Sequence, residues 1–168
     1  GLVIDQVRLD ARSMRRDSLR VNALMVRSRT IDLDFSGSAL PRGAYPLALR
    51  GTWTYRPAGS AVVHGDGTLS GTLERLRVHQ TLSGPLDARV DVTLLRPLRR
   101  QVGFQGDVEF ARLTPRDFGP AWPQGTFEGH VAFDGDTRAA GMQGRVRGTT
   151  EALGPTAADF RVRRLERG

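Results

Sequence analysis

The sequence predicts an all-β fold, an antiparallel meander that curls into an open half-pipe with an apolar concave face. Apolar and polar residues alternate with a period of two over most of the chain, as they do in strands with one buried face. Breaks that contain glycine or proline separate these runs at intervals of roughly 10–15 residues, which is typical of strands joined by turns.

A third observation is the pattern apolar–x–Gly–x–apolar, which recurs along the chain. Side chains alternate between the two faces of a strand, so each glycine falls on the apolar face. A glycine inside a strand often marks a bend or the close approach of another group. The series therefore indicates a sheet whose apolar side curves or leaves room. Its seven copies are centred on Gly37, Gly51, Gly71, Gly84, Gly106, Gly129 and Gly144.

The alternation assigns the first half of the chain to successive strands. Val7, Leu9 and Ala11 share a face, although residues 2–14 also fit a short amphipathic helix. In the next run, Leu24-Met25-Val26 disturbs the alternation and indicates a bulge. Residues 31–37, 47–55 and 63–73 follow as alternating segments.

The second half continues in the same way. From Leu76 to Leu94 every even position is apolar, small or glutamine, and this long run is expected to bend at Pro85 because proline is confined to edges and bulges. Further turns are expected at residues 115–123, 134–136 and 154–155.

An antiparallel sheet with one apolar face must cover that face. No helical stripe suited to that task appears in the sequence, so the sheet either closes as a β-sandwich or curves into a trough that meets a ligand. The 168 residues fit one domain, 1–168, which we interpret as a fragment of a much longer repetitive β-sheet protein.

The net charge of +7 comes from 25 arginines, with no lysine. Arginines alternate with Asp and Glu, and their short clusters lack interleaved aromatic residues, so the pattern disfavours nucleic-acid binding. The chain has no cysteine, hence no disulfide and no thiolate metal site.

No enzyme signature is present. His64, His79 and His130 are isolated among polar neighbours, and neither a nucleophile elbow nor a nucleotide-binding loop occurs. Asp87 and Asp91 share a face with Arg89 between them, which favours a salt-bridged surface over a catalytic carboxylate pair. We expect no catalytic site, no metal and no cofactor.

Two stretches resemble the TamB/AsmA-like family of the diderm bacterial envelope. The first runs from Gly67-Thr68-Leu69-Ser70-Gly71 to Leu82-Ser83-Gly84-Pro85-Leu86. The second runs from Leu113-Thr114-Pro115 through Trp122-Pro123 to Phe133-Asp134-Gly135. The resemblance covers most of residues 30–150 and implies the family's β-taco, a sheet curled lengthwise into a half-pipe.

The resemblance also implies a function. It is that of a lipid-conduit segment in a periplasm-spanning protein anchored in the inner membrane, which carries phospholipid toward the outer membrane. The implied partners are phospholipid acyl chains and, through the parent protein, TamA, a BamA-like outer-membrane protein with a role in outer-membrane protein assembly. Two alternatives stay open: a module that binds client β-strands by edge augmentation, and a structural β-sandwich spacer.

The trough is also plausible on physical grounds. Strands lie ~4.8 Å apart, so eight or nine of them span roughly 40 Å, whereas an acyl chain reaches ~15 Å, half the hydrocarbon core of a bilayer. A fragment whose edge strands have unpaired backbone groups is also expected to self-associate edge to edge. The residues expected to line the groove are Leu33, Phe35, Leu49, Trp53, Leu69, Leu73, Leu82, Leu86, Val90, Phe104, Val108, Phe110, Phe127, Val131, Phe133, Met142 and Val146.

Overall fold

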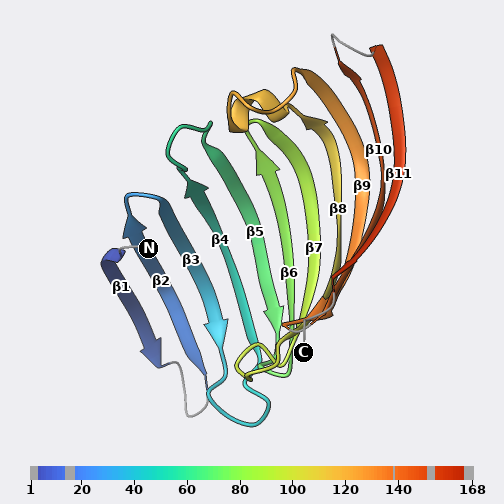
Figure 1. The fold of residues 1–168 in the computed structure, drawn as a ribbon. Coiled ribbons are helices and arrows are strands. Elements are labelled where there is room, and N and C mark those ends of the chain that lie inside the picture. The colour runs from blue at the N-terminus through green and yellow to red at the C-terminus, as the bar shows by residue number, and fades with distance from the viewer. Residues whose placement is uncertain (1–3, 14–17, 138, 151–153, 165–168) are drawn as a thin grey trace.

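The computed structural model describes residues 4–13, 18–137, 139–150 and 154–164. Within these residues, eleven strands form one sheet in which each strand pairs antiparallel with its neighbours in sequence (Figure 1). The strands are β1 (Ile4–Ser13), β2 (Leu19–Ser28), β3 (Ile31–Ala39), β4 (Leu47–Tyr55), β5 (Val63–Gly71), β6 (Arg75–Ser83), β7 (Leu86–Leu95), β8 (Gly103–Leu113), β9 (Gly125–Asp136), β10 (Ala140–Thr150) and β11 (Gly154–Arg164).

The all-β meander predicted from the alternation is therefore confirmed. Among the described residues the one helical element is a 3₁₀ turn, η1 (Pro115–Phe118), in the β8–β9 loop. The alternative helix over residues 2–14 is wrong where the structure describes it, because Ile4–Ser13 is a strand. Val7, Leu9 and Ala11 stand opposite apolar residues of β2. A strand places these three residues on one face, where they can pack against β2, because strand side chains alternate with a period of two.

Several expected turns fall elsewhere. Gly84-Pro85 does not bend a long strand but reverses the chain between β6 and β7, so the Gly84 copy of the glycine pattern lies in a turn. Residues 134–136 continue β9, and residues 154–155 open β11. The bulge in β2 lies at Asn22–Ala23, just before the predicted run, where the register against β3 shifts.

The sheet is one layer thick. It does not close on itself, since β1 and β11 each pair on one side only among the described strands, and it is not split into the two sheets of a sandwich. No described side chain is fully buried. The chain exposes 11743 Å², whereas a compact protein of its mass would expose roughly 8,200 Å². A large part of the apolar surface is therefore left without a covering layer.

Candidate functional site

One face of the sheet carries nearly all the large apolar side chains of the strands. The register connects these residues into rows that cross the sheet at right angles to the strands. The middle row crosses all eleven strands, and its members in order are Leu9, Leu24, Phe35, Gly51, Gly67, Gln80, Val90, Val108, Val131, Gly144 and Phe160. With strands ~4.8 Å apart, the row is about 48 Å long. We call this side of the sheet the apolar face.

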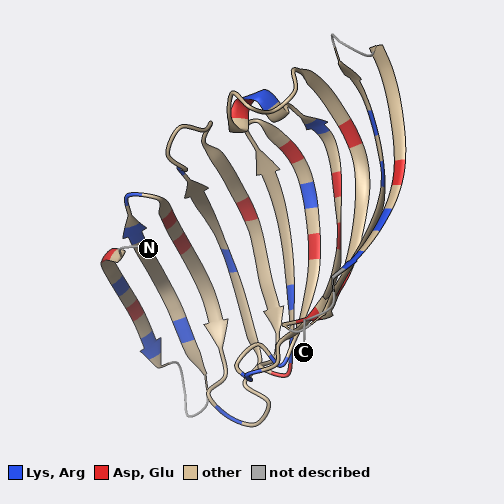
Figure 2. Ribbon diagram, viewed as in Figure 1, with Lys and Arg blue, Asp and Glu red and all other residues tan. Residues whose placement is uncertain are grey.

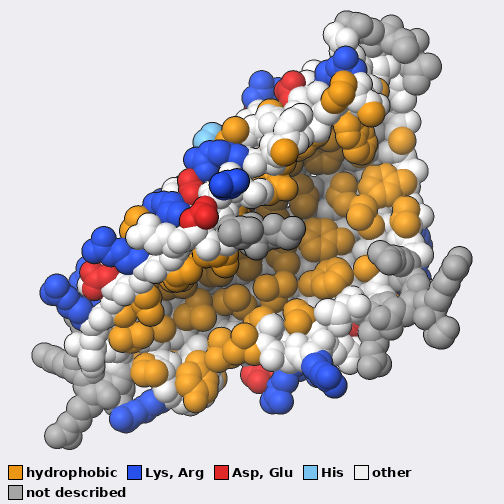
Figure 3. All heavy atoms as spheres, turned by 60° about the vertical axis from the view of Figure 1, so that its left-hand side comes forward, with side chains coloured by type: hydrophobic (Ala, Val, Ile, Leu, Met, Phe, Trp, Pro, Cys, Tyr) orange, Lys and Arg blue, Asp and Glu red, His pale blue; other side chains and the backbone are white. Residues whose placement is uncertain are grey.

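The expected lining residues gather on this face, with one exception. Sixteen of the seventeen lie in strands at positions that share its parity. Leu73 lies in the β5–β6 turn instead, because β5 ends at Gly71. In Figure 3, hydrophobic side chains gather in a hollow of the molecule, and charged side chains lie around its outside.

Six glycines of the apolar face lie beneath aromatic rings. A Cβ atom built on Gly65 would lie 2.2 Å from Cε2 of Trp53, and one built on Gly148 would lie 2.2 Å from Cδ1 of Phe127. The glycines therefore do leave room, as the pattern indicated, but rings of the same sheet take that room. The ring–glycine pairs, each directly opposite in register, are Phe35–Gly51, Trp53–Gly65, Phe110–Gly129, Phe127–Gly148, Phe133–Gly106 and Phe160–Gly144.

Gln80 is the polar member of the middle row, and it is only 7% exposed. Nε1 of Trp53 donates a hydrogen bond to Oε1 of Gln80 at 2.9 Å. The two side chains come from β4 and β6 and meet over β5, whose residues at this level are Gly65 and Gly67. The indole N–H can only donate, so it fixes the amide oxygen toward Trp53 and turns the amide NH₂ away from it.

The opposite face is polar and carries ion pairs between neighbouring strands. Arg112 donates to Asp87 at 2.8 Å, and His79 bonds Asp91 at 2.7 Å. Asp87 and Asp91 thus each bond a basic residue of a neighbouring strand, as predicted for this surface, whereas Arg89 between them forms no ion pair with a described residue. These side chains are about half exposed, and pairs of this kind contribute little to stability.

Two further pairs tie β3 to its neighbours. Arg27 donates to Asp34 at 2.8 Å, and this hydrogen bond raises the pKa of the guanidinium. The hydrogen bond from Arg56 to Asp32, at 2.7 Å, lowers the pKa of that carboxyl group below its usual value.

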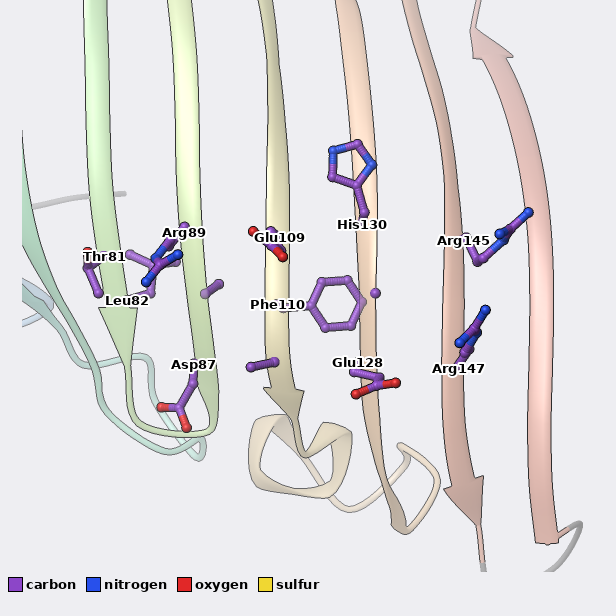
Figure 4. A pocket seen from close by; sticks show the side chains of 13 residues that line it. Thr81, Leu82, Asp87, Arg89, Glu109, Phe110, Glu128, His130, Arg145 and Arg147 are labelled. Carbon is purple, nitrogen blue, oxygen red and sulfur yellow. The ribbon is translucent and has the colours of Figure 1, made fainter.

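The polar face also has an open depression of about 610 Å³ over β6–β10. In Figure 4 the side chains of Arg89, Glu109, His130 and Arg145 come from four successive strands across it. Arg89, Glu109 and His130 alternate between basic and acidic along this row, and Arg145, which faces His130, donates to Asp159 of β11 at 2.7 Å. Such an arrangement favours mutual screening of the charges over capture of a single ion. Among the described residues, no three His, Asp or Glu side chains gather closely enough to hold a metal ion.

The structure adds residues to the apolar face that the sequence analysis did not single out. Leu9 and Leu24 extend the middle row to the first two strands, and Phe160 extends it to the last. The alternation could have indicated these three positions. The alternation also places Gln80 on this face, but its contact with Trp53 could not be predicted, because the partner lies 27 positions away in sequence.

The chain matches no protein-family model, and neither the curated proteins nor the solved structures contain a match to it. The described part of the chain offers no helix that could span a bilayer.

Proposed function

We propose that the chain is a lipid-conduit segment: the sheet forms a half-pipe whose apolar concave face binds the acyl chains of phospholipids. The observation that carries this proposal is the middle row, which crosses every described strand without a covering second layer. The curved strands of Figure 1 and the apolar hollow of Figure 3 support it. The protein has no catalytic part in this proposal.

The row is about 48 Å long, enough for about three acyl chains of ~15 Å laid end to end. Each methylene group that leaves water for the apolar face gains up to about 0.8 kcal/mol. Because most positions of the row are aliphatic, aromatic or glycine, this gain changes little from strand to strand except at the polar Gln80. A chain can therefore slide along the row over low barriers.

The resemblance of two stretches to the TamB/AsmA-like family extends this proposal to a cellular setting. In that setting the segment belongs to a parent protein that is anchored in the inner membrane and spans the periplasm of a diderm bacterium. Phospholipid moves toward the outer membrane, and TamA is the partner of the parent protein.

Native mass spectrometry of the purified chain tests lipid binding directly, with co-purified phospholipid as the expected result. Val131→Arg places a charge in the middle row and is expected to abolish binding. The same result is expected of Leu86→Asp, at the first residue of β7. Ala132→Arg is the matched control, because it adds the same charge one residue on, on the polar face. Equal lipid binding by Val131→Arg and Ala132→Arg would contradict the proposal.

A second candidate function is the capture of client β-strands. The described part of β1 pairs only with β2, and its Val7 and Leu9 side chains are 61% and 63% exposed. Backbone groups on the other side of β1 can accept a strand by augmentation. In that case Leu9→Pro would abolish client binding, and Val131→Arg would leave it unchanged.

For a structural spacer, in contrast, the fluorescence of Trp53 and Trp122 would not respond to added lipid.

A further inference from the structure

The loops at one end of the strands form a connected edge of the sheet. These loops span residues 40–46, 72–74 and 96–102, and they follow β3, β5 and β7. The backbone N–H of Leu73 donates to the carbonyl of Ala44 at 3.4 Å, and that of Arg96 donates to the carbonyl of Glu74 at 2.8 Å. The three loops are thus held relative to one another by backbone hydrogen bonds. We call them the arginine rim.

The arginine rim exposes apolar side chains beside basic ones. Leu98 is 75% exposed and lies between Arg96 on one side and Arg99 and Arg100 on the other. Tyr45, in the loop after β3, is 50% exposed. Figure 2 shows basic positions in the loops at this end of the strands.

The guanidinium groups of Arg96, Arg99 and Arg100 form no ion pair with any residue that the structure describes. Two arginines near the opposite end of the strands are engaged: Arg56 bonds Asp32, and Arg116 donates to the carbonyl of Pro120. The loop after β7 thus holds, within five sequence positions, three arginines without an ion pair to a described residue.

Backbone conformation marks the same loops. Tyr45 has a φ of 51° and Arg96 a φ of 53°, and within the described ranges they are the two non-glycine residues with positive φ. Side chains disfavour this left-handed region, which persists where the surrounding structure holds it. Both residues with positive φ, the exposed Tyr45 and Arg96, lie in the arginine rim.

The arginine rim adjoins the apolar face. Leu76, Leu94 and Phe104 are opposite one another in register, near the ends of β6, β7 and β8 that meet this rim. An amphiphile whose tails lie along the apolar face at these residues can therefore place its polar group at the arginine rim.

We propose that Arg96, Arg99 and Arg100 bind the phosphate group of an acylated lipid whose chains lie on the apolar face. This inference rests on the proposed function and gives it a headgroup preference. Guanidinium groups bind phosphate oxygens through charge-assisted hydrogen bonds, often in pairs, and they keep their charge at any physiological pH. A neutral diacyl lipid would gain the tail contacts alone.

The test compares three ligands by native mass spectrometry and by displacement of a fluorescent fatty acid. They are phosphatidic acid, diacylglycerol with the same acyl chains, and glycerol 3-phosphate. The unmodified chain is expected to bind phosphatidic acid about tenfold more tightly than diacylglycerol, and glycerol 3-phosphate only weakly. The triple variant Arg96→Gln/Arg99→Gln/Arg100→Gln should bind both lipids with the affinity of diacylglycerol.

A matched control removes the same charge from the polar face. Arg50, Arg77 and Arg89 are exposed and unpaired among the described residues, so Arg50→Gln/Arg77→Gln/Arg89→Gln should keep the tenfold preference. The double variant Arg99→Gln/Arg100→Gln leaves the left-handed Arg96 untouched and should lose most of the preference. Far-UV circular dichroism verifies that each variant is folded.

The possible contrary results separate the two proposals. Equal binding of phosphatidic acid and diacylglycerol by the unmodified chain overturns the headgroup inference alone. So does a preference that survives in the triple variant or is lost equally in the control. Binding of glycerol 3-phosphate as tight as that of phosphatidic acid points to a free-phosphate site and overturns the lipid assignment. Failure of both lipids to bind overturns the proposed function itself.

Discussion

Nε1 of Trp53 donates a hydrogen bond to Oε1 of Gln80 at 2.9 Å, across a strand that lies between them. The contact exists because β5 presents glycines, Gly65 and Gly67, where its side chains would otherwise separate the two partners. It places a polar group in the middle of a row that is otherwise apolar or glycine. The pair therefore fixes both side chains and interrupts the uniform surface along which an acyl chain would slide.

Replacement of Gln80 by leucine is expected to destabilise the fold by about 1–3 kcal/mol, because the indole N–H of Trp53 loses its acceptor. Urea denaturation followed by far-UV circular dichroism measures this loss. The double variant Trp53→Phe/Gln80→Leu removes donor and acceptor together, so its destabilisation should be smaller than the sum of the two single changes. Strict additivity would contradict a direct interaction.

Gly65→Ala is expected to cost about 1–3 kcal/mol of the free energy of unfolding, because the new methyl group would overlap the Trp53 ring. The indole would have to leave Gln80 to make room, so the fluorescence spectrum should change as well. Gly141→Ala is the control within the same sheet. Its Cβ would lie 3.4 Å from the nearest atom, Oδ1 of Asp134, and stability should stay within about 0.5 kcal/mol of the parent chain.

The pair Arg56–Asp32 is expected to give a pH-dependent contribution to stability. Arg56 lowers the pKa of Asp32 in the folded state, so the stabilisation is present above the pKa of an unfolded aspartate. It is lost as the pH falls through the lower folded value. Urea midpoints of Arg56→Gln should lie below those of the parent chain at pH 7, and the two should converge in strong acid. Arg50→Gln, which faces Ser36 and Thr68, should show no such convergence.

Asp91 and Asp107 stand directly opposite each other on β7 and β8. Like charges at such positions repel, so Asp107→Asn is expected to stabilise the fold by a few tenths of a kcal/mol, about 0.2–1. The gain should shrink as salt is added, because both carboxylates are exposed to solvent. Asp66→Asn is the control, since Asp66 faces only Thr52 and Thr81; an equal gain there would rule out cross-strand repulsion as the cause.

The alternation predicted the strands because its cause is local: a strand with one solvent-exposed face must place polar residues at every second position. Turn positions were less predictable. Gly84-Pro85 lies inside an alternating run whose parity continues through the turn, so the alternation is unbroken where the chain reverses. Residues 134–136 contain typical turn residues, yet pairing with β8 on one side and β10 on the other keeps them in β9.

The contacts of the candidate site depend on register, which a single strand does not encode. The glycine pattern indicated a bend or empty space, but only the alignment of β4 with β5 brings the Trp53 ring over Gly65. In the same way, the connection between the loops at 72–74 and 96–102 arises from a backbone hydrogen bond that side-chain patterns cannot reveal.

The meander has an odd number of strands in the described chain, so β1 and β11 point the same way. Two copies that met β11 against β1, with their apolar faces on the same side, would pair as parallel strands. Two copies that met through like strands would pair antiparallel, related by a two-fold axis normal to the sheet, with both apolar faces on the same side. Self-association that keeps antiparallel hydrogen bonding and one continuous apolar side would thus join β1 to β1 or β11 to β11, whereas a joint of β11 with β1 would require parallel pairing.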